Sequence, residues 1–328
     1  ILGAYQGLQY LSPDDYIDGR ELDERGNFFV NTPLLLLDRL RTYTRKEEEI
    51  KIIGSVTASY KITDDLTFRS VSSMDYQNEI LTRAEGPNSF NAITFAEDGN
   101  ETPGFQTQSS RRVFTFNQLT SLNYSKTFGK HSIDAGLYTE YFKAHLRSFG
   151  YFAEGLNPKT FSPGDGAGPV EANSANDFFV DDGFATIRNA GLFSYFASAD
   201  YDYDETYGLG ATVRRDVSYR FTGDNTWATF FSVSGRWNIN NEEFMDSVDF
   251  VDVLKLRASY GTAGNQRISG ATYFSVPDLY RELYATGGGY AGQQSVFLGQ
   301  LANPFVQWET VATANLGLDF ELFNSKLR

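Results

Sequence analysis

The sequence contains no cysteine, only two histidines and only two methionines among its 328 residues. Without cysteine there is no disulfide framework and no thiolate metal site. His131 and His145 are too few for a multi-histidine metal site built from this chain alone, and they lie far apart along one predicted strand. Basic residues are also outnumbered, since 28 Lys and Arg stand against 42 Asp and Glu, for a formal net charge of -14. Such a chain lacks the basic surface that nonspecific nucleic-acid binding requires.

Long hydrophobic runs are missing as well, because no uncharged apolar stretch reaches the roughly 18 residues of a membrane-spanning helix. No signal peptide is visible before Ile1, and we expect the natural chain to begin upstream. Aromatic residues and glycine, in contrast, are abundant: the chain has 28 Phe, 20 Tyr, 3 Trp and 30 Gly. This composition favours β structure with many turns over a helical protein.

Apolar and polar residues alternate over most of the chain, which is the period of a β-strand with two unlike faces. The alternation is strict over Ser55–Ile62. One face carries side chains such as Leu137 and Leu256, and the other carries Asp134 and Arg257. The pattern predicts strands at 50–62, 66–83, 112–128, 131–148, 191–204, 207–220, 229–239, 252–262 and 311–322, with a further strand starting at Lys326.

The connections between these strands alternate between short and long. Short turns at 63–65, 129–130, 204–206 and 323–325 alternate with long connections near 85–110, 149–190 and 263–310. In an antiparallel meander, successive connections lie at opposite ends, so one end is tight and the other bears large loops. Bacterial outer-membrane barrels have this asymmetry, with short periplasmic turns and long extracellular loops, whereas a soluble sandwich has no reason for it. We therefore predict an all-β, antiparallel transmembrane β-barrel whose apolar face meets lipid and whose polar face lines the lumen.

No motif predicts catalysis, a cofactor or a metal ion. Gly287–Gly292 fits G-x-G-x-x-G, but it lies in an aromatic, polar loop, so a flexible loop tip is the better interpretation. Asp14–Gly19 resembles the start of a calcium loop, yet Arg25 stands where a bidentate Glu belongs. There is no G-x-S-x-G elbow, and no carboxylate pair is singled out by its spacing. We predict that the chain is not an enzyme and has no catalytic, cofactor-binding or metal-binding residue.

The segment Leu254–Asn265, LKLRASYGTAGN, closely resembles the L-K-L-R-a-S-y-G-x-x-G-N segment of SusC/RagA-like TonB-linked outer-membrane proteins. The resemblance is strong over 190–328, looser over 40–150 and weak over 1–40, and it departs at Val217, where the family has Gly. The family barrel has about 22 strands. The resemblance thus implies that residues 1–328 are a partial barrel domain of about 9–10 strands, with the plug, the TonB box and the closing strands outside it. Other matching segments are Ser194–Phe196, Arg214–Asp216, Phe231–Ser234, Trp308–Thr310 and Asn315–Asp319.

The resemblance implies import of large nutrients, oligosaccharides or peptides, across the bacterial outer membrane. It also implies two partners: a SusD-like surface lipoprotein, and the TonB complex acting through the N-terminal region. A non-transporting β-sandwich or barrel, serving as a binding or adhesion module at the cell surface, is the alternative. An outer-membrane phospholipase is weaker, because no Ser-His arrangement is present. Acids such as Asp181 and Asp182 favour neutral glycans or cationic peptides as substrates.

Aromatic residues in the predicted loops are the candidates for substrate contact, because aromatic rings can stack on sugar rings. Ordinary loop packing or contact with a partner is the alternative for each of them. The candidates are Tyr151, Phe152, Tyr284 and Tyr290.

Overall fold

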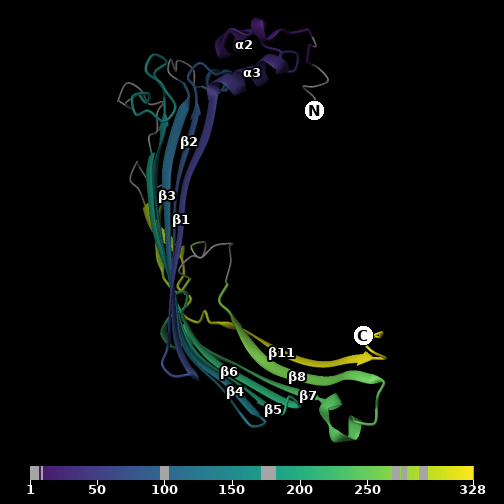
Figure 1. The fold of residues 1–328 in the computed structure, drawn as a ribbon. Coiled ribbons are helices and arrows are strands. Elements are labelled where there is room, and N and C mark those ends of the chain that lie inside the picture. Colours follow the sequence, from purple (N-terminus) through teal and green to yellow (C-terminus); the bar gives the residue numbers. More distant parts are fainter. Residues whose placement is uncertain are drawn as a thin grey trace. The chain divides into compact units, whose positions relative to one another are not determined.

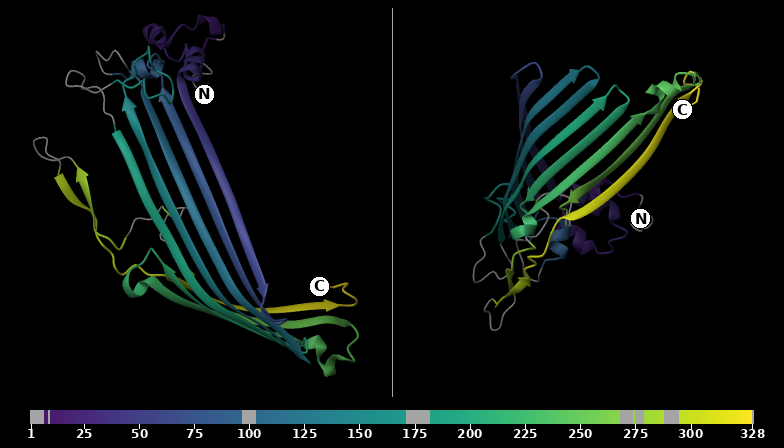
Figure 2. Two further views of the ribbon diagram at one scale, coloured as in Figure 1. Left: turned by 60° about the vertical axis from the view of Figure 1, so that its left-hand side comes forward. Right: turned by 90° about the horizontal axis from the view of Figure 1, so that it is seen from below.

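The structure is a computed structural model that describes residues 7–8, 10–96, 103–170, 182–267, 274, 279–287 and 295–327. Nine strands form one sheet in which β1 to β8 follow chain order and β11 lies beside β8 (Figures 1 and 2). All nine predicted strands are present in this one sheet, whereas the sandwich alternative requires them to be divided between two packed sheets. The strands are β1 (Tyr43–Lys61), β2 (Leu66–Glu85), β3 (Phe105–Phe128), β4 (His131–Glu154), β5 (Asp182–Tyr203), β6 (Tyr207–Ser218), β7 (Trp227–Asn238), β8 (Val251–Asn265) and β11 (Glu309–Leu322).

The register of the strand pairs confirms that the two faces differ. Pairing is antiparallel for β5 with β6, β6 with β7, β7 with β8, and β8 with β11. Arg236 lies opposite Arg257 on one face, while Leu256 lies between Trp237 and Leu318 on the other. The alternation in the sequence therefore becomes a polar face and an apolar face shared across neighbouring strands.

Tight turns connect the strands at the end where the sequence predicts them. Gly129 has φ 60 between β3 and β4, and Asp204 and Glu205 have φ 54 and 56 between β5 and β6. After β11 the chain turns through Phe323–Ser325, all with positive φ, and Leu327 makes an isolated antiparallel bridge to Leu322. The predicted tenth strand is represented, among the described residues, by that bridge alone.

The connections at the other end differ from the prediction in three respects. The strands β4 and β5 extend into both ends of the predicted loop at 149–190, and β3 extends into the predicted loop at 85–110. A two-stranded hairpin, β9 (Leu283–Gly287) with β10 (Ser295–Gln300), stands in the predicted loop at 263–310. Helical segments, which the sequence pattern did not predict, precede β1 and follow β2: η1 (Pro13–Asp15), α2 (Gly19–Arg25), α3 (Thr32–Thr42) and α4 (Phe90–Thr94).

The chain divides into two units, and β1 to β5 contribute residues to both. Unit 1 comprises residues 1–52, 76–113 and 146–188, and its small core is formed by Leu22, Leu34 and Phe90. Unit 2 comprises residues 53–75, 114–145 and 189–328. Its sheet has two largely accessible faces rather than a central core. Within the described residues, no helix combines the length and the apolar character needed to cross a membrane.

Candidate functional site

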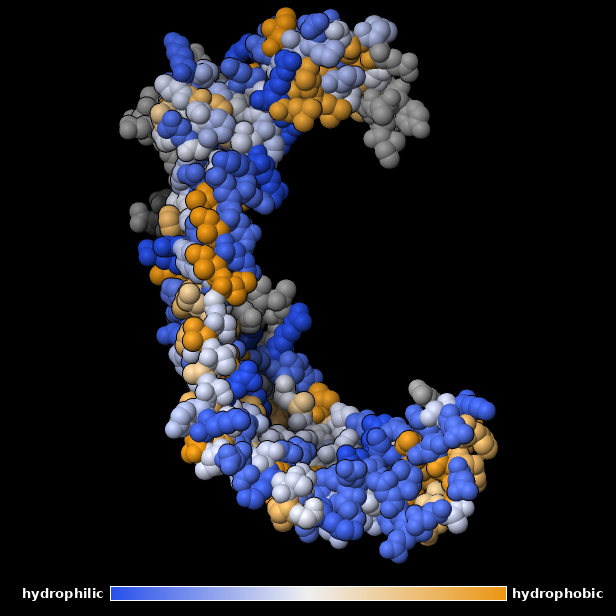
Figure 3. Space-filling model, viewed as in Figure 1, coloured by the Kyte–Doolittle hydropathy of each residue, from blue (hydrophilic) through white to orange (hydrophobic). Residues whose placement is uncertain are grey.

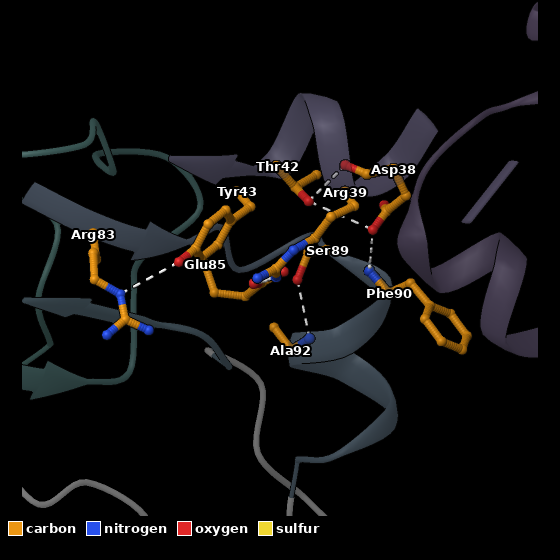
Figure 4. Close-up of polar contacts among 9 residues, drawn as sticks. All are labelled: Asp38, Arg39, Thr42, Tyr43, Arg83, Glu85, Ser89, Phe90 and Ala92. Atoms are coloured by element: carbon orange, nitrogen blue, oxygen red, sulfur yellow. Dashed lines mark hydrogen bonds and ion pairs between the residues drawn. The ribbon is translucent and has the colours of Figure 1, made fainter. Parts of the chain in front are cut away.

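A buried carboxylate fastens the helices of unit 1 onto the loop that carries α4. Asp38 of α3 is 2% exposed, and it accepts a hydrogen bond from the Phe90 backbone N–H at 3.0 Å (Figure 4). It also accepts one from the Tyr16 hydroxyl at 2.9 Å. The backbones come so close that a Cβ on Gly19 would lie 2.0 Å from the Phe90 nitrogen. A buried carboxylate is stable only with such donors, so Asp38 specifies how α3 sits on this loop.

The Tyr16 phenol links this contact to pH. Burial, followed by the hydrogen bond to Asp38, raises the pKa of Tyr16 above its ordinary value near 10. Because the pKa is higher in the docked state, the stabilisation is present below about pH 10 and declines as the pH rises through the raised pKa. Between pH 7 and 9, we expect the protection of α3 from hydrogen exchange to stay constant once the intrinsic exchange rate has been corrected for. At higher pH, α3 should lose less of this protection in Tyr16→Phe than in the parent protein. An equal loss of protection in both proteins would contradict this role of Tyr16.

Beside this contact lies a hollow of about 620 Å³ whose lining comes from several elements of unit 1. Arg39 of α3 pairs with Glu85 at the end of β2, and its guanidinium carbon lies 3.5 Å from the centre of the Tyr43 ring. The Tyr43 hydroxyl in turn accepts a hydrogen bond of 3.3 Å from Arg83 (Figure 4). Asn91 and Phe95 complete one side of the hollow.

Glu85 contributes a buried carboxylate with one unpaired oxygen to the lining of this hollow. Its side chain is 6% exposed, and among the described residues its Oε1 atom has no hydrogen-bond partner although the other oxygen is paired with Arg39. Buried polar atoms are almost always paired, so an unpaired acceptor on a residue that lines a hollow fits a ligand that brings a donor. Phe95, which is 81% exposed, adds an aromatic face. These groups can recognise hydroxyl or amine groups without covalent chemistry.

The described residues give no sign of a metal centre. No cluster of three or more His, Cys, Asp or Glu side chains with metal-ligand geometry occurs among them. The two histidines are in separate contacts: His131 Nδ1 lies 2.7 Å from the Tyr201 hydroxyl, and His145 Nδ1 lies 2.6 Å from the side-chain amide oxygen of Asn189.

The structure corrects the placement of three of the four aromatic candidates. Tyr151 and Phe152 are strand residues of β4, not loop residues, because β4 continues to Glu154. They line a second hollow of unit 1, of about 440 Å³; the Tyr151 hydroxyl accepts from Gln106 at 2.6 Å and Phe152 stacks on Phe105 at 5.7 Å.

Tyr284 is also a strand residue, since it belongs to β9 in unit 2, where it is 65% exposed and donates to Glu282. Tyr290 lies outside the described residues. The structure thus brings together Tyr151 and Phe152 but not all four candidates. Whether any of them contacts substrate stays a prediction.

In unit 2 the predicted polar face forms a groove of about 770 Å³, whose lining includes Asp134, Asp200, Arg236, Arg257 and Asn315. Several charges on this face are paired across strands, as between Arg257 and Asp319 at 2.7 Å. Paired charges of both signs suit a surface in contact with water, as in the lumen of a wide barrel.

Aromatic residues on the opposite face of unit 2 form two belts, which we call the turn-side belt and the loop-side belt. In the turn-side belt, neighbouring ring centres are 5.0 to 6.5 Å apart; it consists of His131, Tyr203, Tyr207 and Trp237. In the loop-side belt, the rings of Tyr195 and Trp227 lie 6.1 Å apart.

The separation of the belts matches the thickness of a membrane. Trp227 and Trp237 are the two ends of the apolar face of β7, roughly 33 Å apart along the strand at about 3.3 Å per residue. A tilt of about 35–45° reduces this to about 25 Å, the height of the lipid-facing band between aromatic girdles. The belts therefore support the prediction that this face meets lipid.

Comparison with known proteins decides the family. The family model described as TonB dependent receptor-like, beta-barrel matches residues 4–328. The chain belongs to this family. Its location is accordingly the bacterial outer membrane, as predicted.

Relatives agree with this assignment. The TonB-dependent receptor P39 of Formosa agariphila is 28% identical over 99% of this chain and 29% of its own length. The TonB-dependent receptor SusC of Bacteroides thetaiotaomicron is 27% identical over 90% of this chain and 28% of its own length. The chain therefore spans less than a third of these curated relatives.

A solved structure of the RagAB peptide transporter superimposes with a TM-score of 0.73 at 21% identity, covering 90% of this chain and 30% of that one. At this identity the likeness shows a shared fold. It confirms the predicted architecture, a part of an antiparallel outer-membrane barrel.

Proposed function

We propose that the protein containing this chain imports large nutrients across the outer membrane, with oligosaccharides as the first substrate class and peptides as the second. The observation that carries the proposal is the two-faced sheet of unit 2, with paired charges on one face and aromatic belts on the other. A sheet of this kind suits the wall between a wide aqueous lumen and lipid. Energy comes from the TonB complex through the N-terminal region.

We assign substrate contact to the hollow around Glu85. The unpaired Glu85 oxygen, the Arg39 guanidinium, the Asn91 amide and the exposed Phe95 ring are the kinds of group that bind polyhydroxyl ligands. With an overall charge of -14, the chain disfavours anionic ligands. A sugar hydroxyl and a protonated peptide amine are both able to donate to Glu85.

A SusD-like surface lipoprotein is the proposed partner. Helix α3 carries apolar side chains that are accessible at its surface, among them Leu36 at 62% and Leu40 at 81% exposure (Figure 3). Exposed apolar side chains of this kind are typical of surfaces that meet another protein. Helices α2 and α3 precede β1 at its long-loop end, which is the end that a capping partner would reach.

Uptake by cells tests the proposal as a whole. Deleting the gene should abolish growth on at least one oligosaccharide in a panel that the parent strain uses, and a protonophore should block uptake of that sugar in the parent. Growth and uptake that are unchanged on every oligosaccharide and peptide in the panel would contradict import as the function.

Changing Glu85 tests the site within that function. In the full-length transporter, Glu85→Gln should weaken binding of the imported substrate about tenfold, since a hydrogen bond to a charged group contributes about 1.5–3 kcal/mol. Isothermal titration measures the affinity. Glu79→Gln is the matched control, because Glu79 lies on the same strand, outside the hollow. Equal affinity for the parent and Glu85→Gln would remove Glu85 from the site.

Ionic strength separates the two substrate classes in the same experiment. A cationic peptide paired with the Glu85 carboxylate should bind more weakly as salt is raised from about 0.05 to 0.5 M. A neutral oligosaccharide should show little change, and this salt dependence should disappear in Glu85→Gln only for the peptide.

A further inference from the structure

The apolar face of unit 2 carries a hollow that is separate from the polar groove. It has a volume of about 670 Å³, and its lining includes apolar-face side chains from five strands: Phe68, Leu122, Leu137, Tyr195 and Val213. The small side chain of Ala197, which pairs with Val213 in the register, leaves space for the hollow. The hollow lies on the face of the aromatic belts, where a barrel wall would meet acyl chains rather than water.

Arg215 stands at the margin of this hollow. It pairs with Tyr195 in the register of β5 and β6, and its guanidinium carbon lies 5.2 Å from the centre of the Trp227 ring. The charge is therefore on the lipid face at the level of the loop-side belt.

Arg215 differs in its pairing from its neighbour in sequence. Arg214, on the polar face, is held by Glu140 at 2.8 Å and Asp216 at 2.6 Å. Arg215 makes no salt bridge with any residue that the structure describes. Thr229, its small partner in β7, leaves the guanidinium accessible. A cation facing lipid is costly unless it reaches an anion at the membrane interface.

We propose that the hollow and Arg215 form a binding site for a membrane lipid with a phosphate headgroup. An acyl chain lies in the hollow, and the phosphate binds the Arg215 guanidinium beside Trp227. Arginine suits this role because its planar fork binds phosphate oxygens in pairs. The site is independent of what the transporter imports and depends on this face meeting lipid.

Lipid binding by the purified full-length transporter tests the site. Native mass spectrometry in detergent micelles, with phosphatidylglycerol or phosphatidylcholine added, measures how much of each lipid is retained. The parent protein should retain phosphatidylglycerol about fivefold more tightly, the difference that roughly 1 kcal/mol per interfacial Arg or Lys represents. Arg215→Gln should lose this preference, and Arg215→Lys should keep part of it.

Two further variants test the acyl-chain contact. Ala197→Leu fills the hollow without changing charge and should reduce retention of both lipids. Ala199→Leu is the matched control, two residues along the same face and outside the lining, and should leave retention unchanged.

The assignment would be overturned if the parent showed no headgroup preference, or if Arg215→Gln retained the parent's preference. Displacement of phosphatidylglycerol by inorganic phosphate, with no effect of Ala197→Leu, would show an anion site instead of a lipid site and would likewise overturn it. Thermal unfolding of each variant, measured without added lipid, establishes that the protein is folded.

Discussion

Replacing Asp38 with alanine is expected to release α2 and α3 from the loop of α4 while the sheet stays folded. The Phe90 N–H and the Tyr16 hydroxyl would both lose their acceptor. Each orphaned donor costs about 1–3 kcal/mol, and the Tyr16 hydroxyl is only partly buried, so docking should weaken by roughly 2–4 kcal/mol. Hydrogen exchange of residues 19–42 in the full-length protein should therefore accelerate by about 30-fold to 700-fold, provided that exchange proceeds through undocking.

Two variants make this expectation specific. Asp38→Asn retains one acceptor and the side-chain volume, so its exchange should fall between those of the parent and Asp38→Ala. Asp14→Ala removes an exposed carboxylate from η1, the short helix that precedes α2, and should change little. Protection of residues 19–42 that is the same in Asp38→Ala and the parent would show that the apolar core of Leu22, Leu34 and Phe90 holds the helices without Asp38.

The sequence predicts the strands of unit 2 because each face has one environment there. Leu254, Leu256 and Ala258 alternate with Lys255, Arg257 and Ser259, and the register of β8 with β11 retains this separation. The same reasoning underestimates β4, where Phe149–Phe152 shows no such alternation yet is strand. At 24 residues, β4 is longer than the 9–11 residues that a strand needs to cross a membrane, so part of it has no lipid-facing side to impose the pattern.

Helices α2 and α3 and the Glu85 hollow were not predicted from the sequence, for a different reason. Some local signals exist, since Asp18 caps α2 and Pro33 lies in the first turn of α3. The run Leu34–Leu37, however, has no helical periodicity, and the contact that defines the docking joins Asp38 to Phe90, far along the chain. The pairing of Arg39 with Glu85 likewise depends on β2 ending beside α3. Contacts of this kind come from the fold and leave no spacing to recognise in the sequence.

Val233→Arg is expected to impair folding of the full-length transporter into lipid vesicles by about 2–4 kcal/mol. Val233 lies on the belt face of β7 between Trp227 and Trp237, and it pairs with Ala211 and Tyr260. That position is close to the middle of the apolar band, where a lipid-facing arginine is most costly. Leu256→Arg should cost less, about 0–1 kcal/mol, because Leu256 pairs with Trp237 in the turn-side belt.

Ser232→Arg is the matched comparison, because Ser232 is the preceding residue of the same strand and faces the polar side, opposite Thr212 and Gly261. An arginine there reaches the aqueous lumen and should be tolerated to within about 1 kcal/mol, since lumen substitutions mainly affect selectivity. Urea-dependent folding into vesicles measures all three variants against the parent. If Ser232→Arg were the costly change and Val233→Arg the mild one, the two faces would be inverted: the belts would line the lumen, and Arg215 would face water instead of lipid.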